Sequence, residues 1–355
     1  MVNDEFFVRW TGKLLLEKTQ IGRMGTVCLD NIRLWLDDEL VVDQWDSVSS
    51  PFQDRYIEFQ QGKYYDIKIE YQKKKGGGSE VKLGWNFDQA SIEEAVEVAK
   101  GKDVAIVVVG DSRQTSGEGK DRSSLDLPGK QKQLVQEVYN TGTPVILVLL
   151  NGRPMTVQWE EKHVDGIIEA WYLGEKGGQA IAEVLFGDHN PAGRLPMTIP
   201  KYVGQLPIYY NMLMFGQKHY IDMDSLPLFT FGFGLSYTEF IYKNLTITPS
   251  KVPTDGTVEI GVDVVNIGTR NGDEVVQMYI NDVISTIATP DKQLKRFKRI
   301  YLHSGERQSI RFTLDIKELA YLDGNMKQVV EPGNFEIMVG GSSESLIKDT
   351  LCVKY

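Results

Sequence analysis

Hydrophobic and polar residues alternate in short runs over residues 1–88, as in residues 33–45 and 63–72, and turn residues separate the runs. Alternation with a period of two places successive side chains on opposite faces of a β-strand. This part of the chain is therefore predicted to form an antiparallel β-sandwich.

The pattern changes at Ser91. An amphipathic helix is predicted over residues 91–103, with Ser91 as its cap, and it leads into the continuous apolar run 103–110. A strand buried on both faces is typical of a parallel α/β sheet. The same alternation continues with a helix over residues 129–140, strands over 144–152 and 164–171, and a helix over 177–188. Helices between apolar strands predict a three-layer α/β sandwich over residues 89–230.

Strand-like alternation returns after residue 231. Its clearest runs cover residues 257–268, 273–282, 307–315 and 333–342. Such spacing is typical of a sandwich, so residues 231–355 are predicted to form a second all-β domain. The fold class expected for the whole chain is multidomain α/β plus all-β.

Composition and charge limit the classes of partner that the protein is expected to bind. The 355 residues carry a net charge of -10, which argues against a broad basic face for nucleic acid or anionic membrane. Lys73 to Lys75 precede three glycines, which predicts a solvated hairpin tip. The N-terminus has no basic segment followed by an apolar core, and no run approaches a membrane span of about 20 residues. We therefore expect no membrane partner, and the sequence favours a cytoplasmic location.

Glu118 lies between two glycines, one loop beyond the apolar run 103–110. Ligands and catalytic groups on open α/β sheets gather at the carboxyl ends of the strands. Glycines on both sides let the backbone approach a ligand closely. Glu118 is either a functional carboxylate or a solvated loop residue.

Asp121 and Arg122 follow in the same loop. The planar donors of Arg122 suit a carboxylate or a sugar hydroxyl, with a paired Asp121 to orient them. An ion pair that pins the loop is an equally good interpretation. Trp35 and Trp45 have the aromatic faces that stack on sugar rings, although tryptophans on alternating strands more often belong to a core.

Several other chemistries lack support. Ser112 after Gly110-Asp111 suggests a serine hydrolase, but no histidine stands at a spacing that supplies the base. Gly119-Lys120 resembles the end of a phosphate loop, yet Asp121 stands where Ser or Thr is needed. No HExxH, CxxC or acidic calcium loop occurs. We therefore expect no metal and no cofactor.

Four long segments together resemble one family. Residues 117–131, 147–154, 170–200 and 227–242 are similar to hallmark segments in the C-terminal part of family 3 glycoside hydrolases, chiefly bacterial and fungal β-glucosidases. Residues 264–280 and 330–345 resemble the fibronectin type III-like module of the same enzymes. Residues 8–16 and 30–45 resemble a protective-antigen-like β-sandwich that some members carry. The resemblance covers nearly the whole chain.

The resemblance implies a retaining, exo-acting hydrolase of β-linked glucosides or related oligosaccharides. In the family a barrel-borne Asp attacks the anomeric carbon and a loop Glu is the general acid/base. Glu118 matches that loop Glu, and Asp121-Arg122 match the Asp-Arg pair that follows it. Leu29-Asp30 replaces the tandem Asp pair that helps to hold calcium in sugar-binding relatives of the first module. Loops of that module, with Trp35 and Trp45, are candidates for the aglycone side.

The family's nucleophile segment has no counterpart in this chain, and a (β/α)₈ barrel of about 250 residues does not fit beside the domains already assigned. The match to the protective-antigen-like module also begins inside that module, a few strands after its usual start. We therefore expect the chain to be an acid/base-bearing C-terminal part, completed by a barrel chain or a missing N-terminal segment. A homodimer is compatible with this interpretation.

An alternative belongs to another functional class. The chain would then be a non-catalytic carbohydrate-binding or interaction protein that keeps only the accessory domains. It predicts sugar binding that depends on Trp35 or Trp45 and does not depend on Glu118.

Overall fold

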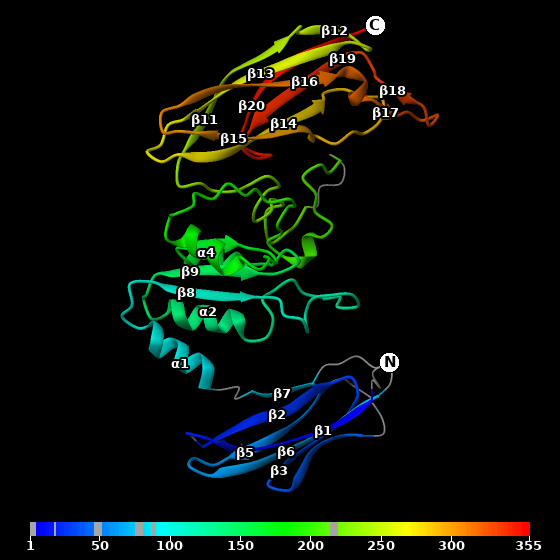
Figure 1. The fold of residues 1–355 in the computed structure, drawn as a ribbon. Coiled ribbons are helices and arrows are strands. Elements are labelled where there is room, and N and C mark those ends of the chain that lie inside the picture. Colours follow the sequence, from blue (N-terminus) through cyan, green and yellow to red (C-terminus); the bar gives the residue numbers. More distant parts are fainter. Residues whose placement is uncertain (1–4, 18, 46–51, 75–80, 87–89, 214–218) are drawn as a thin grey trace. The chain divides into compact units, whose positions relative to one another are not determined.

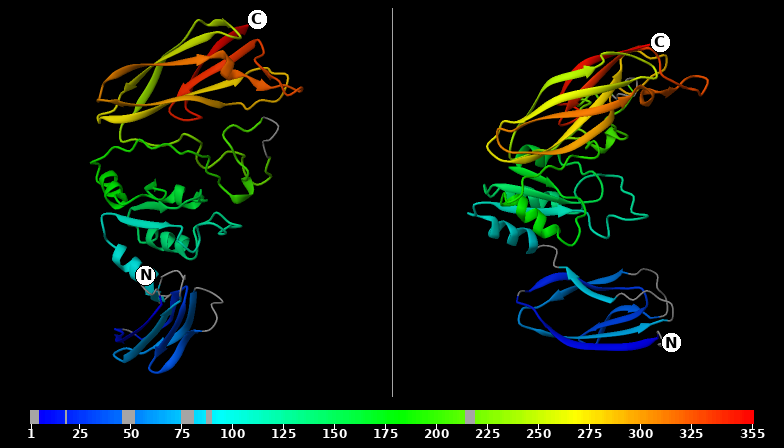
Figure 2. Two further views of the ribbon diagram at one scale, coloured as in Figure 1. Left: turned by 45° about the vertical axis from the view of Figure 1, so that its right-hand side comes forward. Right: turned by 45° about the horizontal axis from the view of Figure 1, so that its top comes forward.

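The computed structural model describes residues 5–17, 19–45, 52–74, 81–86, 90–213 and 219–355. Contacts divide the chain into two compact units (Figures 1 and 2). The first comprises residues 1–102 with 140–143, and the second comprises residues 103–139 with 144–355.

The first unit contains the predicted antiparallel β-sandwich. One sheet has the order β1-β6-β3-β4 and the other β5-β2-β7. Met24, Ile32, Leu34 and Phe59 are fully buried in its core, as period-two alternation requires. The strands are β1 (Phe6–Leu15), β2 (Gln20–Cys28), β3 (Asn31–Leu36), β4 (Glu39–Gln44), β5 (Phe52–Phe59), β6 (Tyr64–Lys73) and β7 (Val81–Asn86).

Two details of this unit bear on the predictions. Strand β6 ends at Lys73, and the predicted hairpin tip at Lys75 and the following glycines lies outside the described residues. Helix α1 comprises Ala90–Ala99, and the predicted role of Ser91 as its cap concerns a side chain outside those that the structure describes.

The second unit begins with the parallel sheet. Strands β8 (Ala105–Gly110), β9 (Val145–Leu150) and β10 (Gly166–Glu169) pair in the order β10-β9-β8. Helices α2 (Gln131–Tyr139) and α4 (Gly177–Leu185) lie on opposite faces of it (Figure 1). A short helix, α3 (Gln158–His163), was not predicted. The three-layer α/β arrangement is confirmed.

Strand β8 differs from its prediction in one respect. Val107 and Val109 are buried, but Val104, Ile106 and Val108 are 45%, 45% and 54% exposed. The prediction that this run is buried on both faces is therefore wrong. The reason is that β8 is an edge strand of the described sheet, and α2 packs against β8 and β9 from one face. A run of apolar residues predicts that a strand tends to be buried. It does not show which elements pack against that strand.

The last domain is a β-sandwich. One sheet comprises β11 (Phe240–Thr248), β13 (Thr257–Asn266) and β16 (Arg307–Asp315) in this order. The other comprises β12 (Lys251–Pro253), β20 (Leu346–Lys354), β19 (Gly333–Gly340), β14 (Gly272–Asp282) and β15 (Gln293–Leu302). The second unit also contains a hairpin of β17 (Tyr321–Leu322) and β18 (Gln328–Val329), and the 3₁₀ turns Val203–Gln205 and Ile316–Leu319.

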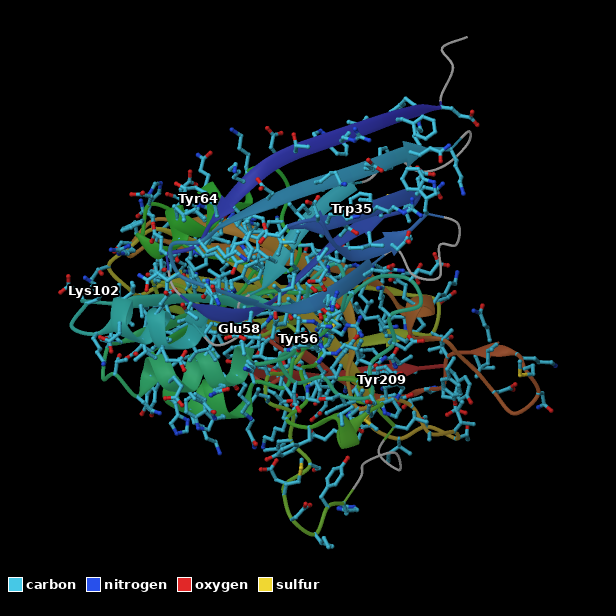
Figure 3. All side chains as sticks on the ribbon, turned by 90° about the horizontal axis from the view of Figure 1, so that it is seen from below. Trp35, Tyr56, Glu58, Tyr64, Lys102 and Tyr209 are labelled. Carbon is cyan, nitrogen blue, oxygen red and sulfur yellow. The ribbon has the colours of Figure 1, made fainter. Side chains whose placement is uncertain are left out.

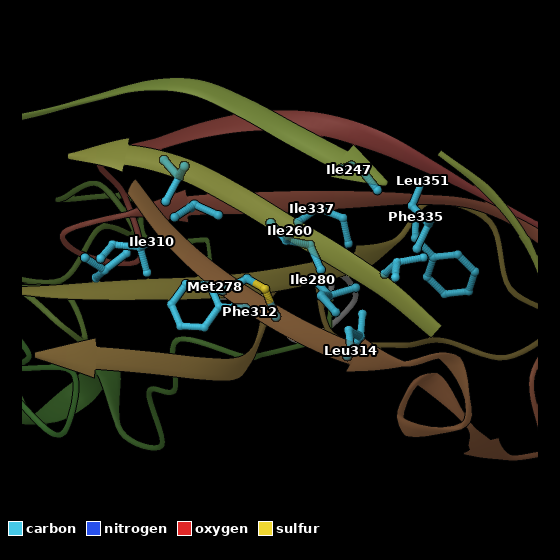
Figure 4. Close-up of a cluster of buried hydrophobic side chains, with 14 of the residues drawn as sticks. Ile247, Ile260, Met278, Ile280, Ile310, Phe312, Leu314, Phe335, Ile337 and Leu351 are labelled. Atoms are coloured by element: carbon cyan, nitrogen blue, oxygen red, sulfur yellow. The ribbon is translucent and has the colours of Figure 1, made fainter. Parts of the chain in front are cut away.

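Alternate residues of these strands fill the core of the last sandwich (Figure 4). Ile260, Met278, Ile310 and Ile337 are 0 to 1% exposed. Each comes from a different strand, so the core joins the two sheets face to face. This confirms the second all-β domain.

Candidate active site

Three parallel strands end at the same edge of the sheet, and each brings a polar residue there. Asp111 follows β8, Asn151 follows β9 and Glu169 ends β10. Gly110 precedes Asp111 with φ +138°, and a Cβ at Gly110 would lie 2.0 Å from the carbonyl oxygen of Leu150. Only glycine therefore fits at the end of β8 without displacing the backbone of β9.

Asp111 has a fully buried side chain and fixes the loop that follows it. Its Oδ1 accepts hydrogen bonds from Thr115 Oγ1 at 2.9 Å and from Arg122 Nη1 at 3.3 Å. Its Oδ2 lies 3.4 Å from Nε of Arg153. Two guanidinium groups thus compensate one buried carboxylate, whose side chain is 0% exposed.

Glu118 lies at the tip of that loop. Thr115 N and Ser116 N both donate to Ser112 O, and Lys120 N donates to Gly117 O at 3.1 Å. Gly119 has φ +67° beside Glu118, a left-handed conformation that favours glycine. Glu118 is exposed, and no hydrogen bond or ion pair holds its carboxylate among the residues that the structure describes.

Arg122 pairs with a residue other than Asp121, its neighbour in the sequence. Its Nη1 pairs with Asp111, and its Nη2 donates to Asp126 O at 2.6 Å. Asp121 is exposed, and its proposed part in orienting Arg122 stays a prediction. Arg122 thus pins the loop through Asp111 and Asp126.

A second, half-buried carboxyl group lies at the end of β10. Glu169 Oε1 accepts from Trp171 N at 3.1 Å, and Oε2 accepts from Asn151 Nδ2 at 3.3 Å. Burial raises the pKa of Glu169 to about 7, although these hydrogen bonds oppose the rise. Trp171 has φ +53°, so the carboxylate bonds to a sharply bent backbone.

The bend at Trp171 brings Tyr172 against the same edge. A Cβ at Gly152 would lie 2.6 Å from Tyr172 Cε2 and 3.3 Å from Ser116 Oγ. Tyr172 is 58% exposed. The segment after β10 therefore lies beside the loop that carries Glu118.

Trp35 and Trp45 belong to the first unit and are half-buried. Lys68 Nζ lies 4.1 Å from the ring centroid of Trp35, and Arg33 Cζ lies 5.0 Å from that of Trp45. Figure 3 labels Trp35 on the strands of the first sandwich. Each ring therefore has a cation over it, a contact that stabilises surface aromatics, and the aglycone role of these residues stays a prediction.

A cavity of about 230 Å³ is present elsewhere in the second unit. Tyr209, Tyr210 and Phe231 line it together with Lys292 and Glu344. None of its lining residues belongs to the Glu118 loop. No group of three or more His, Cys, Asp or Glu side chains suited to a metal ion occurs in the described ranges, and no described helix is long and apolar enough to cross a membrane.

Most of the sequence matches families of known proteins. Residues 15–237 match the glycosyl hydrolase family 3 C-terminal domain, and residues 274–343 match the fibronectin type III-like domain. The first match covers more than half of the chain. The chain belongs to glycosyl hydrolase family 3.

Relatives within family 3 extend the match. A beta-xylosidase of Formosa agariphila is 42% identical over 79% of this chain and 40% of its own length. A periplasmic beta-glucosidase of Salmonella typhimurium is 41% identical over 74% of this chain and 36% of its own length. The structure of a beta-glucosidase from Kluyveromyces marxianus in complex with glucose aligns with a TM-score of 0.80 and 28% identity, covering 99% of this chain and 45% of that one.

The chain therefore spans about two fifths of the length of these family 3 relatives. The described residues contain no (β/α)₈ barrel and hence no counterpart of the barrel nucleophile. The recognition of the family from the hallmark segments, with the barrel absent from this chain, is confirmed.

Two residues of the loop scaffold escaped the sequence reasoning. In the sequence, Asp111 stands out only as a neighbour of Ser112, and Arg153 only as part of a family segment. Both stand within three residues after a strand of the parallel sheet, and that position alone was a signal. Ser112 itself bonds to Thr115 and to Gln114 N.

Proposed function

We propose that this chain supplies the general acid/base of a retaining, exo-acting β-glucosidase-type hydrolase, with Glu118 as the proton donor. The observation that carries the proposal is the loop geometry. Buried Asp111 and its two arginine partners hold a loop at the carboxyl edge of the sheet, and the loop presents Glu118 at its tip, exposed and without a partner among the described residues. A general acid needs this combination of fixed backbone and free carboxyl group.

The reaction needs a second carboxylate that this chain does not supply. In retaining glycosidases an Asp or Glu attacks the anomeric carbon, and the acid protonates the departing oxygen. The acid, now ionised, takes a proton from the water that cleaves the glycosyl ester. The two carboxyl groups stand about 5 to 5.5 Å apart. In the proposal, Glu118 performs both proton transfers and an Asp on a (β/α)₈ barrel forms the ester.

Two features support a partner that completes the site. The cavity lined by Tyr210 and Phe231 and the one lined by Pro290 and Phe335 include no residue of the Glu118 loop, so neither of them encloses a sugar next to Glu118. Ile106 and Val108 present half-exposed apolar side chains from edge strand β8, whereas parallel sheets are normally covered on both faces. We propose that the additional part of the longer relatives, which includes the barrel, covers this face of β8.

Four further residues are proposed to contribute to the function. Arg122, through its contacts with Asp111 and Asp126, orients the loop. Asp121 is exposed in the same loop and is proposed to contact the sugar or the completing segment. Trp35 and Trp45 are proposed as aglycone-side residues, because their rings are half-buried and not part of the fully buried core.

The test supplies a family 3 barrel to this chain, as a separate chain or as a fusion. With the barrel present, Glu118→Gln is expected to lower kcat/KM for methyl β-glucoside by about 10²- to 10⁴-fold, the usual size of general acid catalysis. The matched control is Glu161→Gln, because Glu161 is an exposed glutamate on α3. If Glu118→Gln leaves hydrolysis at the control level, the acid/base assignment is wrong.

The carbohydrate-binding alternative makes the opposite forecast for the chain by itself. It expects sugar binding that Trp35→Ala or Trp45→Ala abolishes and Glu118→Gln does not change. The acid/base proposal expects negligible turnover of nitrophenyl β-glucoside by the 355-residue chain. Measurable turnover that is lost in Glu118→Gln would refute the need for a barrel partner.

A further inference from the structure

Arg153 contacts both ends of the loop that carries Glu118. Its Nη2 donates to Thr115 O at 3.1 Å and to Lys120 O at 3.1 Å. These carbonyls stand three residues before and two residues after Glu118. Arg153 lies after β9 and outside the loop, and a single one of its nitrogens bonds to both ends of the loop.

The same guanidinium group is itself held in position. Its Nε lies 3.4 Å from Oδ2 of Asp111, and its side chain is 22% exposed. Asp111 is the first residue after β8. Arg153 thus bonds the end of β9 to the Glu118 loop through two carbonyls, and its ion pair with Asp111 adds the end of β8.

The other hydrogen bonds of the loop backbone between Ser112 and Lys120 come from within the loop. Its remaining backbone bonds are local turns, and glycines flank Glu118 on both sides. The other arginine partner of Asp111, Arg122, donates beyond the tip to Asp126 O. A misplacement of about 1 Å at a reacting group can cost about 10²-fold in rate, so the restraint on the loop base matters for proton transfer.

We propose that Arg153 is a positioning residue that sets where the Glu118 carboxyl group stands relative to the glycosidic oxygen. This inference rests on the acid/base function proposed above. It assigns Arg153 no contact with the substrate. Its effect acts through the Thr115 and Lys120 carbonyls.

The first test needs only the 355-residue chain. Hydrogen exchange of the amides of Ser116 and Lys120, which donate within the loop, is compared in wild type, Arg153→Gln and Arg153→Lys. Both variants are expected to exchange these amides at least about tenfold faster, because neither side chain has the guanidinium fork. The control is Arg299→Gln, whose arginine pairs with Asp273 in the last domain. Unchanged exchange in Arg153→Gln would overturn the proposal.

The second test separates positioning from general damage. With a barrel supplied, kcat/KM is measured for methyl β-glucoside, whose leaving oxygen needs a proton, and for 2,4-dinitrophenyl β-glucoside, whose leaving group does not. Arg153→Gln is expected to lose at least about tenfold on the first substrate and less than about threefold on the second. Arg153→Lys is expected to show the same selectivity. An equal loss on both substrates would mean that Arg153 only supports the fold.

The same pair of substrates keeps the two proposals apart. Glu118→Gln must itself show the selective loss on methyl β-glucoside if Glu118 is the acid. If Glu118→Gln shows it and Arg153→Gln does not, positioning by Arg153 is wrong and the acid/base function stands. If Glu118→Gln shows no selectivity, the acid/base function fails, and positioning by Arg153 fails with it.

Discussion

At the scale of single residues, two carboxyl groups at the edge of the parallel sheet differ in their partners. Asp111 is compensated by two guanidinium groups, whereas Glu169 has only two hydrogen-bond donors and no cation in its described contacts. A buried carboxyl group without a cation favours its neutral form. The two carboxyl groups therefore differ in what they contribute to stability, although both stand at strand ends.

Glu169 makes the stability of the second unit depend on pH. Its folded-state pKa is about 7, against an ordinary value of 4.5. Between these values the unfolded chain releases the proton and the folded chain keeps it, so the free energy of unfolding falls as pH rises through the window. The difference is roughly 3 kcal/mol at most, and it is constant above about pH 7.

Urea unfolding of wild type and Glu169→Gln from about pH 4 to 8 measures this effect. Wild type is expected to lose stability relative to the variant between about pH 4.5 and 7, because the amide that replaces the carboxyl group does not titrate. Glu161→Gln, which alters an exposed residue of α3, reports the effect of removing a surface charge. A difference between wild type and Glu169→Gln that is independent of pH would contradict the account.

At the scale of elements, a buried ion pair joins the segment after α4 to the last sandwich. Arg194 Nη2 lies 2.8 Å from Glu274 Oε2, with side-chain exposures of 10% and 4%. Tyr242 donates its hydroxyl to the other oxygen of Glu274 at 2.9 Å. Burial raises the pKa of Glu274, and Arg194 opposes that rise. Breaking such a pair leaves an uncompensated buried charge, whereas replacing both partners does not.

Arg194→Leu is accordingly expected to destabilise the second unit by about 3 to 5 kcal/mol in urea unfolding. The double variant Arg194→Leu/Glu274→Met is expected to recover at least about half of that loss, because no buried charge is left without a partner. Arg299→Gln, which removes an exposed arginine of the last domain, is the control. A double variant less stable than Arg194→Leu would show that the pair itself contributes the stability.

A glycine at the end of β8 gives a second prediction at this scale. Gly110→Ala places a Cβ 2.0 Å from Leu150 O at φ +138°, so the strand end must move. We expect a loss of about 2 kcal/mol or more, in the range of other strained backbone positions. Gly142→Ala also stands at a positive φ but meets no atom within 4 Å, so it separates backbone strain from the clash. Equal losses in the two variants would argue against a clash at Gly110.

At the scale of the whole molecule, periodicity predicted the fold class and several of the longer strands because burial acts on every second residue. The placement of Glu118 was also predictable, since it depends only on the loop that follows β8. The partners of Arg122 and the contacts of Arg153 were not, because they join residues from different strand ends. The exposed face of β8 was missed for a similar reason: an apolar run does not reveal its neighbours.

We propose that the catalytic groups are divided between this chain and a barrel. Glu118 and the residues that hold its loop come from this chain, whereas the nucleophile and the sugar-binding floor come from a barrel. Family 3 relatives exceed this chain by more than half of their length. Activity is therefore expected to be a property of the completed protein and not of the 355 residues by themselves.

The most direct measurement of this claim is the product formed when the barrel-completed Glu118→Ala variant is supplied with 2,4-dinitrophenyl β-glucoside and sodium azide. The activated leaving group departs without a proton, and azide needs no general base to attack the glycosyl ester. The account predicts β-glucosyl azide and a faster turnover with azide in Glu118→Ala, and neither in wild type. Failure of azide to accelerate the variant, or formation of the α-anomer, would contradict it.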